Sequence, residues 1–199
     1  MIVFAYPAKT PGIADHVKGF SPNAKKAVAQ APGLSNQDIE KHKVIEFSNF
    51  SDNFAISAPV EHGEAVFRIL SWAICNLLQK RFIVREGVTV GHLYHSPEII
   101  FGPALVEAVD IEKDAKFSRF LCSHGLIEHL DGTPYKNKVI FQDCYEDWVV
   151  NTWCGTRALL GDLMKIIQKQ ILHMTKDKDI RKWQYMERML SKMYELKPE

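Results

Sequence analysis

The sequence predicts an α+β fold built on an antiparallel sheet. Short apolar or alternating runs typical of strands are interspersed with segments of helical periodicity. Two pairs of strand-like runs are separated by only two or three turn residues, which forces antiparallel pairing. The order of strand, loop, hairpin, helix, hairpin, helix and strand leaves the helices free to cover one face of the sheet.

Hydrophobic spacing and turn chemistry predict the individual elements. Apolar residues at i, i+3 and i+4 give residues 61–80 the clearest helical pattern, and Pro103 begins another helix because its missing N–H leaves no bond unmade there. Residues 7–43 are rich in Pro and Gly and have room for only a short helix. The predicted strands are residues 2–6, 44–50, 53–58, 83–95, 99–101, 116–122 and 138–145, and the predicted helices are residues 23–30, 61–80, 103 onward, 156–175 and 177–196.

The last two helices are predicted to form an antiparallel pair. The first of them carries Leu159, Leu160, Leu163, Ile166, Ile167 and Ile171 on a common side. We therefore divide the chain into an α+β domain over residues 1–155 and a helical extension over residues 156–199 that packs on it. The sequence shows no repeat of 20–50 residues that would indicate a solenoid.

Composition and charge argue against several classes of protein. An apolar fraction of 46% and a charged fraction of 25% are ordinary for a globular domain, and no apolar run approaches the roughly 20 residues that span a bilayer. A net charge of +1 gives no field to attract nucleic acid or an anionic membrane, so neither is predicted as a partner. The N-terminus lacks the positive region of a signal peptide.

The cysteines are widely spaced, which predicts free thiols and a cytoplasmic location. They are Cys75, Cys122, Cys144 and Cys154.

Three polar residues are placed where a ligand could meet them. Asp52 is predicted at the tip of the first hairpin, where a carboxylate could bind a hard cation, although Asp is also a common turn residue. Arg85 and Arg119 each stand inside a strand-like run, and an Arg among apolar strand residues usually has a specific partner. That partner is either a phosphate or a carboxylate. The carboxylates that would serve are Glu86, Glu107 and Glu112.

Gly102 and Pro103 precede a helix whose first N–H groups would suit an anionic ligand, and plain helix initiation explains the same two residues. We predict that the carboxylate of Asp52 faces this helix start across a shared anionic pocket. His92 and His95 lie three apart in a strand-like run, so they should occupy opposite faces, share no metal and lie at the surface.

A pair near residue 122 could also carry chemistry. Cys122 close to His124 suggests a nucleophile with a base, and the alternative is a buried thiol beside an exposed imidazole. The sequence contains neither a GK[ST] phosphate loop nor a GxGxxG pattern, so no standard loop for cradling phosphates is predicted.

Four segments, taken in order, resemble one family. They are FSDNFAIS, VREGVTVGHLYH, IIFGPALVEAVDIE and AKFSRFL. In this order and spacing they resemble the bacterial class III nucleotide cyclase homologues that include the pyrimidine cyclases of Pycsar antiphage defence. The likeness runs from Val44 to about Leu121, and the late WQYMERML also resembles the family's terminal helix. The FGPAL…EA…IE block is its most specific part.

The resemblance implies a ferredoxin-like cyclase core and a homodimer with sites at the subunit interface. In such a site two metal ions, Mg²⁺ or Mn²⁺, assist attack of the ribose 3′-hydroxyl on the α-phosphate of a nucleoside triphosphate. The implied product is a 3′,5′-cyclic nucleotide such as cyclic UMP or cyclic CMP, made in antiphage defence. The site residues carried over by position are Asp52 for metal, Arg85 and Arg119 for catalysis, and Phe50, Gly102 and Pro103 for nucleotide binding.

The sequence departs from the family at the end of the first strand. Tyr6 stands where the family has a second metal-binding Asp, and a tyrosine cannot replace that ligand at neutral pH. Asp15 follows several residues too late to substitute directly. Three hypotheses remain open: a metal-dependent cyclase, a cyclase-fold protein with a degenerate site that acts through nucleotide binding or dimerisation, and a structural module that docks through its C-terminal helices.

Overall fold

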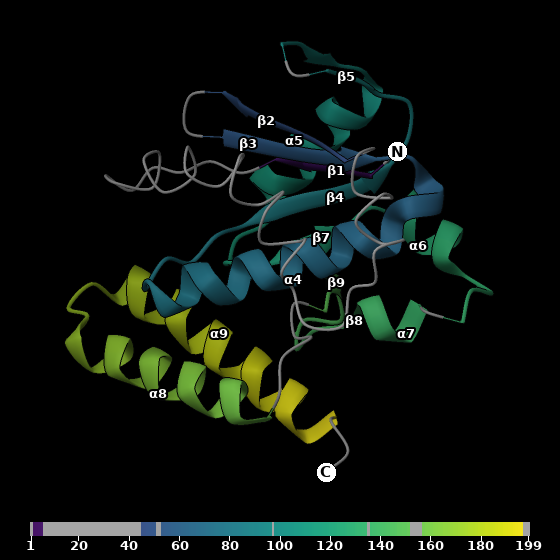
Figure 1. The fold of residues 1–199 in the computed structure, drawn as a ribbon. Helices are drawn as coiled ribbons and strands as arrows, with labels where there is room; N and C mark the ends of the chain where they lie inside the picture. Colours follow the sequence, from purple (N-terminus) through teal and green to yellow (C-terminus); the bar gives the residue numbers. More distant parts are fainter. Residues whose placement is uncertain are drawn as a thin grey trace.

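The computed structural model describes residues 2–5, 45–50, 53–96, 98–134, 136–151 and 157–196. The predicted helix over residues 23–30, the turn containing Asp52, and Tyr6 lie outside these residues. The elements in chain order are β1 (Ile2–Ala5), β2 (Glu46–Phe50), β3 (Asn53–Ala58), η2 (Val60–His62), α4 (Gly63–Gln79), β4 (Glu86–Val90), β5 (Tyr94–His95), β6 (Ile100–Phe101), α5 (Pro103–Asp114), β7 (Phe120–Cys122), α6 (His124–Leu130), α7 (Lys136–Val139), β8 (Ile140–Gln142), β9 (Trp148–Val150), α8 (Arg157–His173) and α9 (Asp177–Leu196) (Figure 1).

One sheet organises these elements, in the order β2-β3-β1-β4-β7-β9-β8. The three pairings among its first four strands are antiparallel, and α4 carries the chain from β3 across β1 to β4. That strand order and crossover are the ferredoxin-like arrangement. The pairing of β4 with β7 is parallel, with α5 as its connection. The predicted α+β class, the largely antiparallel sheet and the C-terminal helical pair are therefore confirmed.

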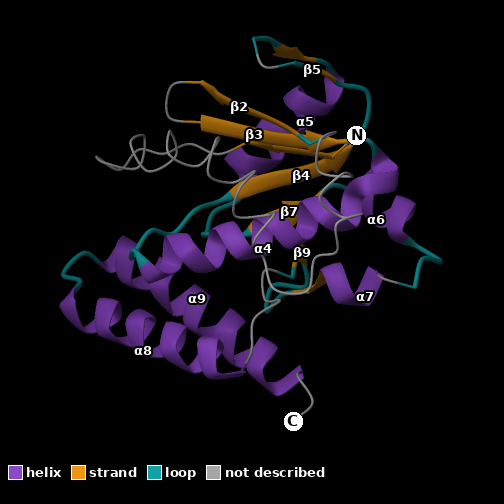
Figure 2. Ribbon diagram, in the orientation of Figure 1, coloured by secondary structure: helices purple, strands orange, loops and turns teal. Residues whose placement is uncertain are grey.

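The helices cover both faces of the sheet, which corrects the expectation that they share one face. Val88 of β4 packs in the main hydrophobic core beside α4. Gly87 and Thr89 point the other way, because side chains alternate along a strand, and they meet α5. Figure 2 shows α4 in front of the strands and α5 behind them. The α5 side has only a small apolar cluster, centred on Ala104 and Ala108.

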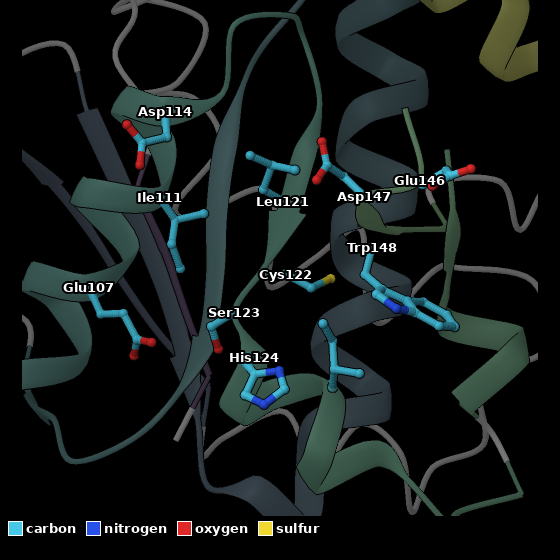
Figure 3. Close-up of a pocket in the computed structure, with 11 residues that line it drawn as sticks. Glu107, Ile111, Asp114, Leu121, Cys122, Ser123, His124, Glu146, Asp147 and Trp148 are labelled. Atoms are coloured by element: carbon cyan, nitrogen blue, oxygen red, sulfur yellow. The ribbon is translucent and has the colours of Figure 1, made fainter. Parts of the chain in front are cut away.

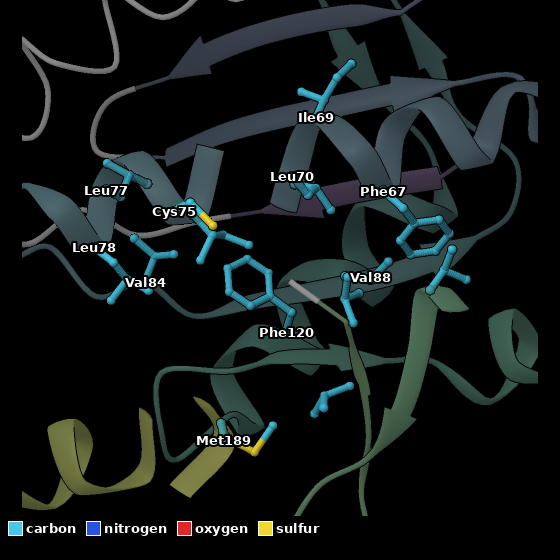
Figure 4. Close-up of a cluster of buried hydrophobic side chains, with 14 of the residues drawn as sticks. Phe67, Ile69, Leu70, Cys75, Leu77, Leu78, Val84, Val88, Phe120 and Met189 are labelled. Carbon is cyan, nitrogen blue, oxygen red and sulfur yellow. The ribbon is translucent and has the colours of Figure 1, made fainter. Parts of the chain in front are cut away.

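The main core joins the sheet, α4 and the C-terminal helices in one cluster. Leu70 and Leu78 of α4 are fully buried against strand residues such as Phe120 (Figure 4). Leu163 of α8 and Met189 of α9 belong to the same cluster. The helical pair is therefore packed on the sheet domain through a continuous core. The boundary at residue 155 stays a prediction, because residues 152–156 lie outside the described ranges.

Local patterns failed to predict the structure where tertiary contacts decide it. The predicted strand over residues 83–95 is only β4 in the main sheet, and after Gly91 the chain leaves to form the separate two-stranded sheet of β5 and β6. The predicted strand over residues 116–122 shortens to β7, and residues 138–145 hold the end of α7 and then β8. Helix α6 and strand β9 were not predicted.

Two further expectations from the sequence concern the state of the cysteines and membrane-spanning segments. The three cysteines among the described residues, Cys75, Cys122 and Cys144, are all free thiols. No helix in the described ranges is both long enough and apolar enough to cross a bilayer.

The contact between α5 and β4 gives a test of the fold. A Cβ on Gly87 would overlap the carbonyl oxygen of Ala108 and lie 2.9 Å from the Cβ of Ile111. We expect Gly87→Ala to lower the free energy of unfolding by about 1–3 kcal/mol, since backbone must move to admit the methyl group. Gly91→Ala is the matched control, because its nearest neighbour is the Ala104 Cβ at 3.1 Å, and it should cost less. Urea unfolding measures both; equal losses would contradict this account.

Candidate functional site

The sheet places the predicted arginines and the first hairpin at one end. Ala5 of β1 pairs with Gly87, and the β2–β3 hairpin extends beyond Ala5 to its last pair, Phe50 with Asn53. Arg85 precedes β4 at this same end. Arg119 lies beside it, because the N–H of Glu86 donates to the carbonyl of Arg119 at 3.0 Å. Asp52 itself lies outside the described residues.

Gly102 and Pro103 lie at the opposite end of the sheet. The N–H of Ala104 donates to the carbonyl of His92 at 3.2 Å, just past β4. At that end Val90 pairs with Ile2, which pairs with Ala58. Ala58 is five residues along β3 from Asn53, or roughly 17 Å at about 3.4 Å per residue. The pocket that we predicted between the first hairpin and the start of α5 is therefore not formed within one chain.

The start of α5 also has few donors to offer an anion. Pro103 has no N–H. The N–H of Ala104 is taken by His92, and that of Leu105 donates to the carbonyl of Gly102 at 3.1 Å. Gly102 has a φ of +142°, and a Cβ there would lie 2.7 Å from the carbonyl oxygen of His92. These two residues therefore fit a tight turn into the helix better than a phosphate cradle.

Arg85 has one of the carboxylate partners that the sequence suggested. Its guanidinium forms an ion pair with Glu112 at the end of α5, and it also donates to the carbonyl of Ala115 at 3.5 Å. The side chain of Arg85 is 39% exposed, whereas that of Glu112 is 8% exposed. The pair holds the end of α5 to the start of β4 and leaves one side of the guanidinium open to solvent.

Arg119 is the centre of a buried polar network. Its Nη1 atom lies 3.0 Å from Oδ2 of Asp143 and 2.7 Å from Oδ2 of Asp147, in the turn between β8 and β9. The hydroxyl of Tyr185 on α9 donates to Asp143 at 2.8 Å. Burial alone would lower the pKa of Arg119, but the hydrogen bond to Asp143 and the charges of both aspartates raise it above its ordinary value. Burial, and then the bond to Asp143, raise the pKa of Tyr185.

The partners of Arg119 were not suggested by the sequence, because they lie 24 and 28 residues further along the chain. The side chain of Arg119 is 9% exposed and its charge is already neutralised by two carboxylates, so it has little capacity left for a phosphate. Arg119 fits the role of joining β7, the β8–β9 turn and α9. Its predicted catalytic role would have to act through that turn.

A groove of about 390 Å³ opens on the α5 face of the sheet. Figure 3 shows Glu107 and Asp114 of α5 on one side and Asp147 and Trp148 on the other. Cys122 and its strand β7 form the floor. The sequence had singled out Glu107, Cys122 and His124 separately, but it did not show that they line one groove.

A chain of hydroxyls fixes one carboxylate of the groove. Thr89 Oγ1 lies 2.5 Å from Oε2 of Glu107 and 2.9 Å from Oγ of Ser123. A hydroxyl has one hydrogen and an ionised carboxylate only accepts, so Thr89 donates to Glu107 and Ser123 donates to Thr89. Ser123 in turn accepts from the N–H of Leu126 at 3.1 Å as the N-cap of α6. The relay orients Glu107 toward the groove.

The chemistry of the groove favours positive charge. Its carboxylates would repel a triphosphate that brings no cation. Within the described ranges, no three His, Cys, Asp or Glu side chains are arranged to hold a metal ion. Burial raises the pKa of Cys122, so its thiol is a poor nucleophile, and the nearby His124 side chain is 85% exposed. Cys122 is half-buried in the groove, so the structure is closer to the alternative of an unactivated thiol beside an exposed imidazole.

Comparisons with known proteins give similarities to solved structures alone. No protein-family model matches the chain, and no curated protein matches it. The chain is similar to a bacterial light-regulated adenylyl cyclase of known structure, with 15% identity and a TM-score of 0.41, over 84% of this chain and 56% of that one. It therefore spans little more than half of that chain, and identity this low transfers no activity.

Removal of Arg119 should weaken the fold. We expect Arg119→Met to lower the free energy of unfolding by about 3–5 kcal/mol, because it leaves the buried carboxylate of Asp143 without its counter-charge. Adding Asp143→Asn should restore part of that loss, since the amide oxygen can still accept from the N–H groups of Tyr145 and Asp147 while the amide nitrogen donates to the hydroxyl of Tyr185. Lys113→Met is the control, as the ion pair of Lys113 with Asp110 is exposed and should change stability by under about 1 kcal/mol. Unchanged urea unfolding with lost activity would instead support catalysis by Arg119.

Glu86 gives a test that depends on pH. This residue is 1% exposed, its Oε2 has no hydrogen-bond partner among the described residues, and burial followed by the charge of Glu112 raises its pKa well above the ordinary value. The folded chain thus keeps a proton that the unfolded chain releases above about pH 4.5. The contribution of Glu86 to the free energy of unfolding is therefore complete below about pH 4.5. It is lost as the pH rises toward the pKa that Glu86 has in the folded state.

We expect Glu86→Gln to remove this part of the pH dependence and to equal or exceed the wild type in stability near pH 8, since the amide stays neutral in both states. Urea unfolding from about pH 4.5 to 8 measures both chains. Parallel stability curves for wild type and variant would show that Glu86 is ionised in the folded protein.

Proposed function

We propose that this chain is a nucleotide cyclase that forms a 3′,5′-cyclic nucleotide from a nucleoside triphosphate with the help of Mg²⁺ or Mn²⁺. The proposed substrate is a pyrimidine nucleotide, with cyclic UMP or cyclic CMP as product, and the proposed setting is antiphage defence in the cytoplasm. The observation that carries the proposal is the mutual packing of the two segments on which the family resemblance chiefly depends.

Those two segments, VREGVTVG and FGPALVEAVDIE, meet along their whole length. Arg85 of the first pairs with Glu112 of the second. Gly87 lies against Ala108, and a Cβ on Gly91 would lie 3.1 Å from the Cβ of Ala104. The residues that carry the family resemblance thus pack against one another, with α5 lying on β4. A chance likeness of two separate segments would not require this.

The proposed metal site lies at the end of the sheet where the first hairpin turns. Asp52 is the proposed protein ligand, with the remaining positions taken by phosphate oxygens of the substrate, as magnesium sites usually allow. A bound metal would lower the pKa of the ribose 3′-hydroxyl and neutralise charge on the triphosphate. Phe50 precedes the turn and is proposed to contact the nucleotide. Arg85 is the arginine better suited to reach a phosphate, because its side chain is partly exposed.

The proposed active form is a homodimer, because Asp52 belongs to one end of the sheet and Gly102 with Pro103 to the other. Two copies in opposite orientation would bring the hairpin end of one to the α5 start of the other. An exposed apolar patch surrounds that helix start. Its members are Tyr94, Ile99, Phe101 and Val106, which are 53–61% exposed. Such a patch usually marks an interface.

The test is product formation by the purified full chain. Incubation with Mn²⁺ and each of ATP, GTP, CTP and UTP, followed by mass spectrometry, should give a cyclic product from a pyrimidine triphosphate. Asp52→Ala should abolish it, and Ser51→Ala, one residue away in the same turn, should retain most of it. Absence of product from all four triphosphates in the wild type would remove the enzymatic proposal.

A second candidate function has one observation in its favour, which is Tyr6 at the end of the first strand in place of a metal-binding Asp. The alternative is a cyclase-fold protein that binds a nucleotide or dimerises without turnover. In that case a triphosphate should raise the melting temperature while no cyclic product forms, since a ligand of the folded state must stabilise it. Neither binding nor product would favour a structural docking module.

A further inference from the structure

The two-stranded sheet of β5 and β6 forms an arm, defined as residues 92–96 and 98–101, that reaches over the α5 face of the main sheet (Figure 1). Its short strands pair Tyr94 with Phe101 and His95 with Ile100. The rings of Tyr94 and Phe101 stack at 5.1 Å on its exposed side. A hairpin with two pairs of residues is too short to be stable alone, so contacts with the main sheet must fix its position.

His95 makes those contacts. Its Nδ1 atom lies 2.7 Å from Oγ of Ser57 on β3, and its Nε2 atom lies 2.8 Å from Oγ of Ser48 on β2. The hydroxyl of Ser48 also donates to the carbonyl of Ser96 at 3.5 Å. The imidazole is thus clamped between two strands of the main sheet. The surface position predicted for His95 was wrong, and the structure places it half-buried under the arm.

The hydrogen bonds are best satisfied when Nε2 carries the proton. Because Ser48 gives its hydrogen to Ser96, it must accept from the ring, so Nε2 carries the proton. Nδ1 is then unprotonated and accepts from the hydroxyl of Ser57. Protonation of Nδ1 would make the ring the donor in this contact, so the hydroxyl of Ser57 would have to accept and its own hydrogen would lose its acceptor. Ser57 is 1% exposed, and its hydroxyl hydrogen has no other acceptor among the described residues.

We propose that His95 is an acid-sensitive latch, which holds the arm against β2 and β3 while its ring is neutral and releases the arm when the ring is protonated. A protonated ring would leave a buried hydroxyl hydrogen without an acceptor and place a cation under the arm. Both costs disappear when the imidazole moves into water. Release would free the apolar patch from its fixed orientation.

The surroundings of the ring supply little to hold a cation. The two contacting groups, Ser48 and Ser57, are neutral. Glu46 is the carboxylate on the same face of β2, next to Ser57 in the register, and the arm itself carries His92 and Glu98. Burial lowers the pKa of His95 to about 4, with no charged partner opposing it. The latch is therefore closed at neutral pH, and its contribution to arm stability is lost as pH falls from about 6.5 toward 4.

Amide hydrogen exchange, corrected for the intrinsic pH dependence of exchange, tests the latch without reference to catalysis. The Ser96 amide, which donates to the carbonyl of Ile99 at 2.9 Å, reports on the arm. The amide of Val88, inside β4 and the main core, reports on the core. Between about pH 7.5 and 4.5 the opening constant of the arm should rise roughly 70-fold, as expected for a group whose pKa moves from about 6.5 to 4. The core amide should not follow it.

His95→Gln keeps a donor and an acceptor but cannot titrate, so it should remove the pH dependence of arm exchange. His95→Phe should open the arm at every pH. His92→Gln, an exposed histidine on the same arm, is the matched control and should behave as the wild type. An NMR titration of His95 with a midpoint near 6.5, or arm opening that survives unchanged in His95→Gln, would overturn the proposal.

Discussion

The close approach of α5 to β4 sets the geometry on which the rest of the α5 face depends. Gly87 lets the backbone of the helix touch the strand at Ala108, and this contact fixes the axis and rotation of α5. One consequence is that Glu107 faces Thr89 and the groove. Another is that Glu112 reaches Arg85 at the far end of the helix. A side chain at Gly87 would push α5 away from β4. Because the helix is rigid, the contacts of Ala108, Glu107 and Glu112 with Gly87, Thr89 and Arg85 would be disturbed together.

The sequence predicted elements whose cause is local. Helix α9 begins and ends as predicted because its amphipathic pattern is complete within the segment, and the β2–β3 hairpin follows from its two-residue turn. The bend at Gly91 is different, since the chain leaves the sheet where Ala104 of α5 crosses it. Strand β9 has three residues and no periodicity to detect. Helix α6 had a usable signal in its N-cap, Ser123, that the hydrophobic pattern did not emphasise.

The same difference between local and long-range causes applies to the candidate site. The pairing of Arg85 with Glu112 was among the predicted alternatives, because both residues belong to recognisable segments. The partners of Arg119 were not, since Asp143 reaches it only through the β8–β9 turn and a helix from the end of the chain supplies Tyr185. Such a network is defined by three elements that meet in space. No single window of sequence contains enough of it to reveal a buried ion pair.

The charges near the hairpin end of the sheet bear on the proposed triphosphate site, because one copy of the chain offers it little positive field. Arg119 is neutralised by two carboxylates and Arg85 by one, so the two arginines at the hairpin end of the sheet supply little net positive field. The groove beside α5 adds further negative charge. A bound nucleoside triphosphate would therefore need its positive charge from metal ions or from a second copy. Both sources belong to the proposed dimer, and a monomer without metal should bind triphosphate poorly for electrostatic reasons alone.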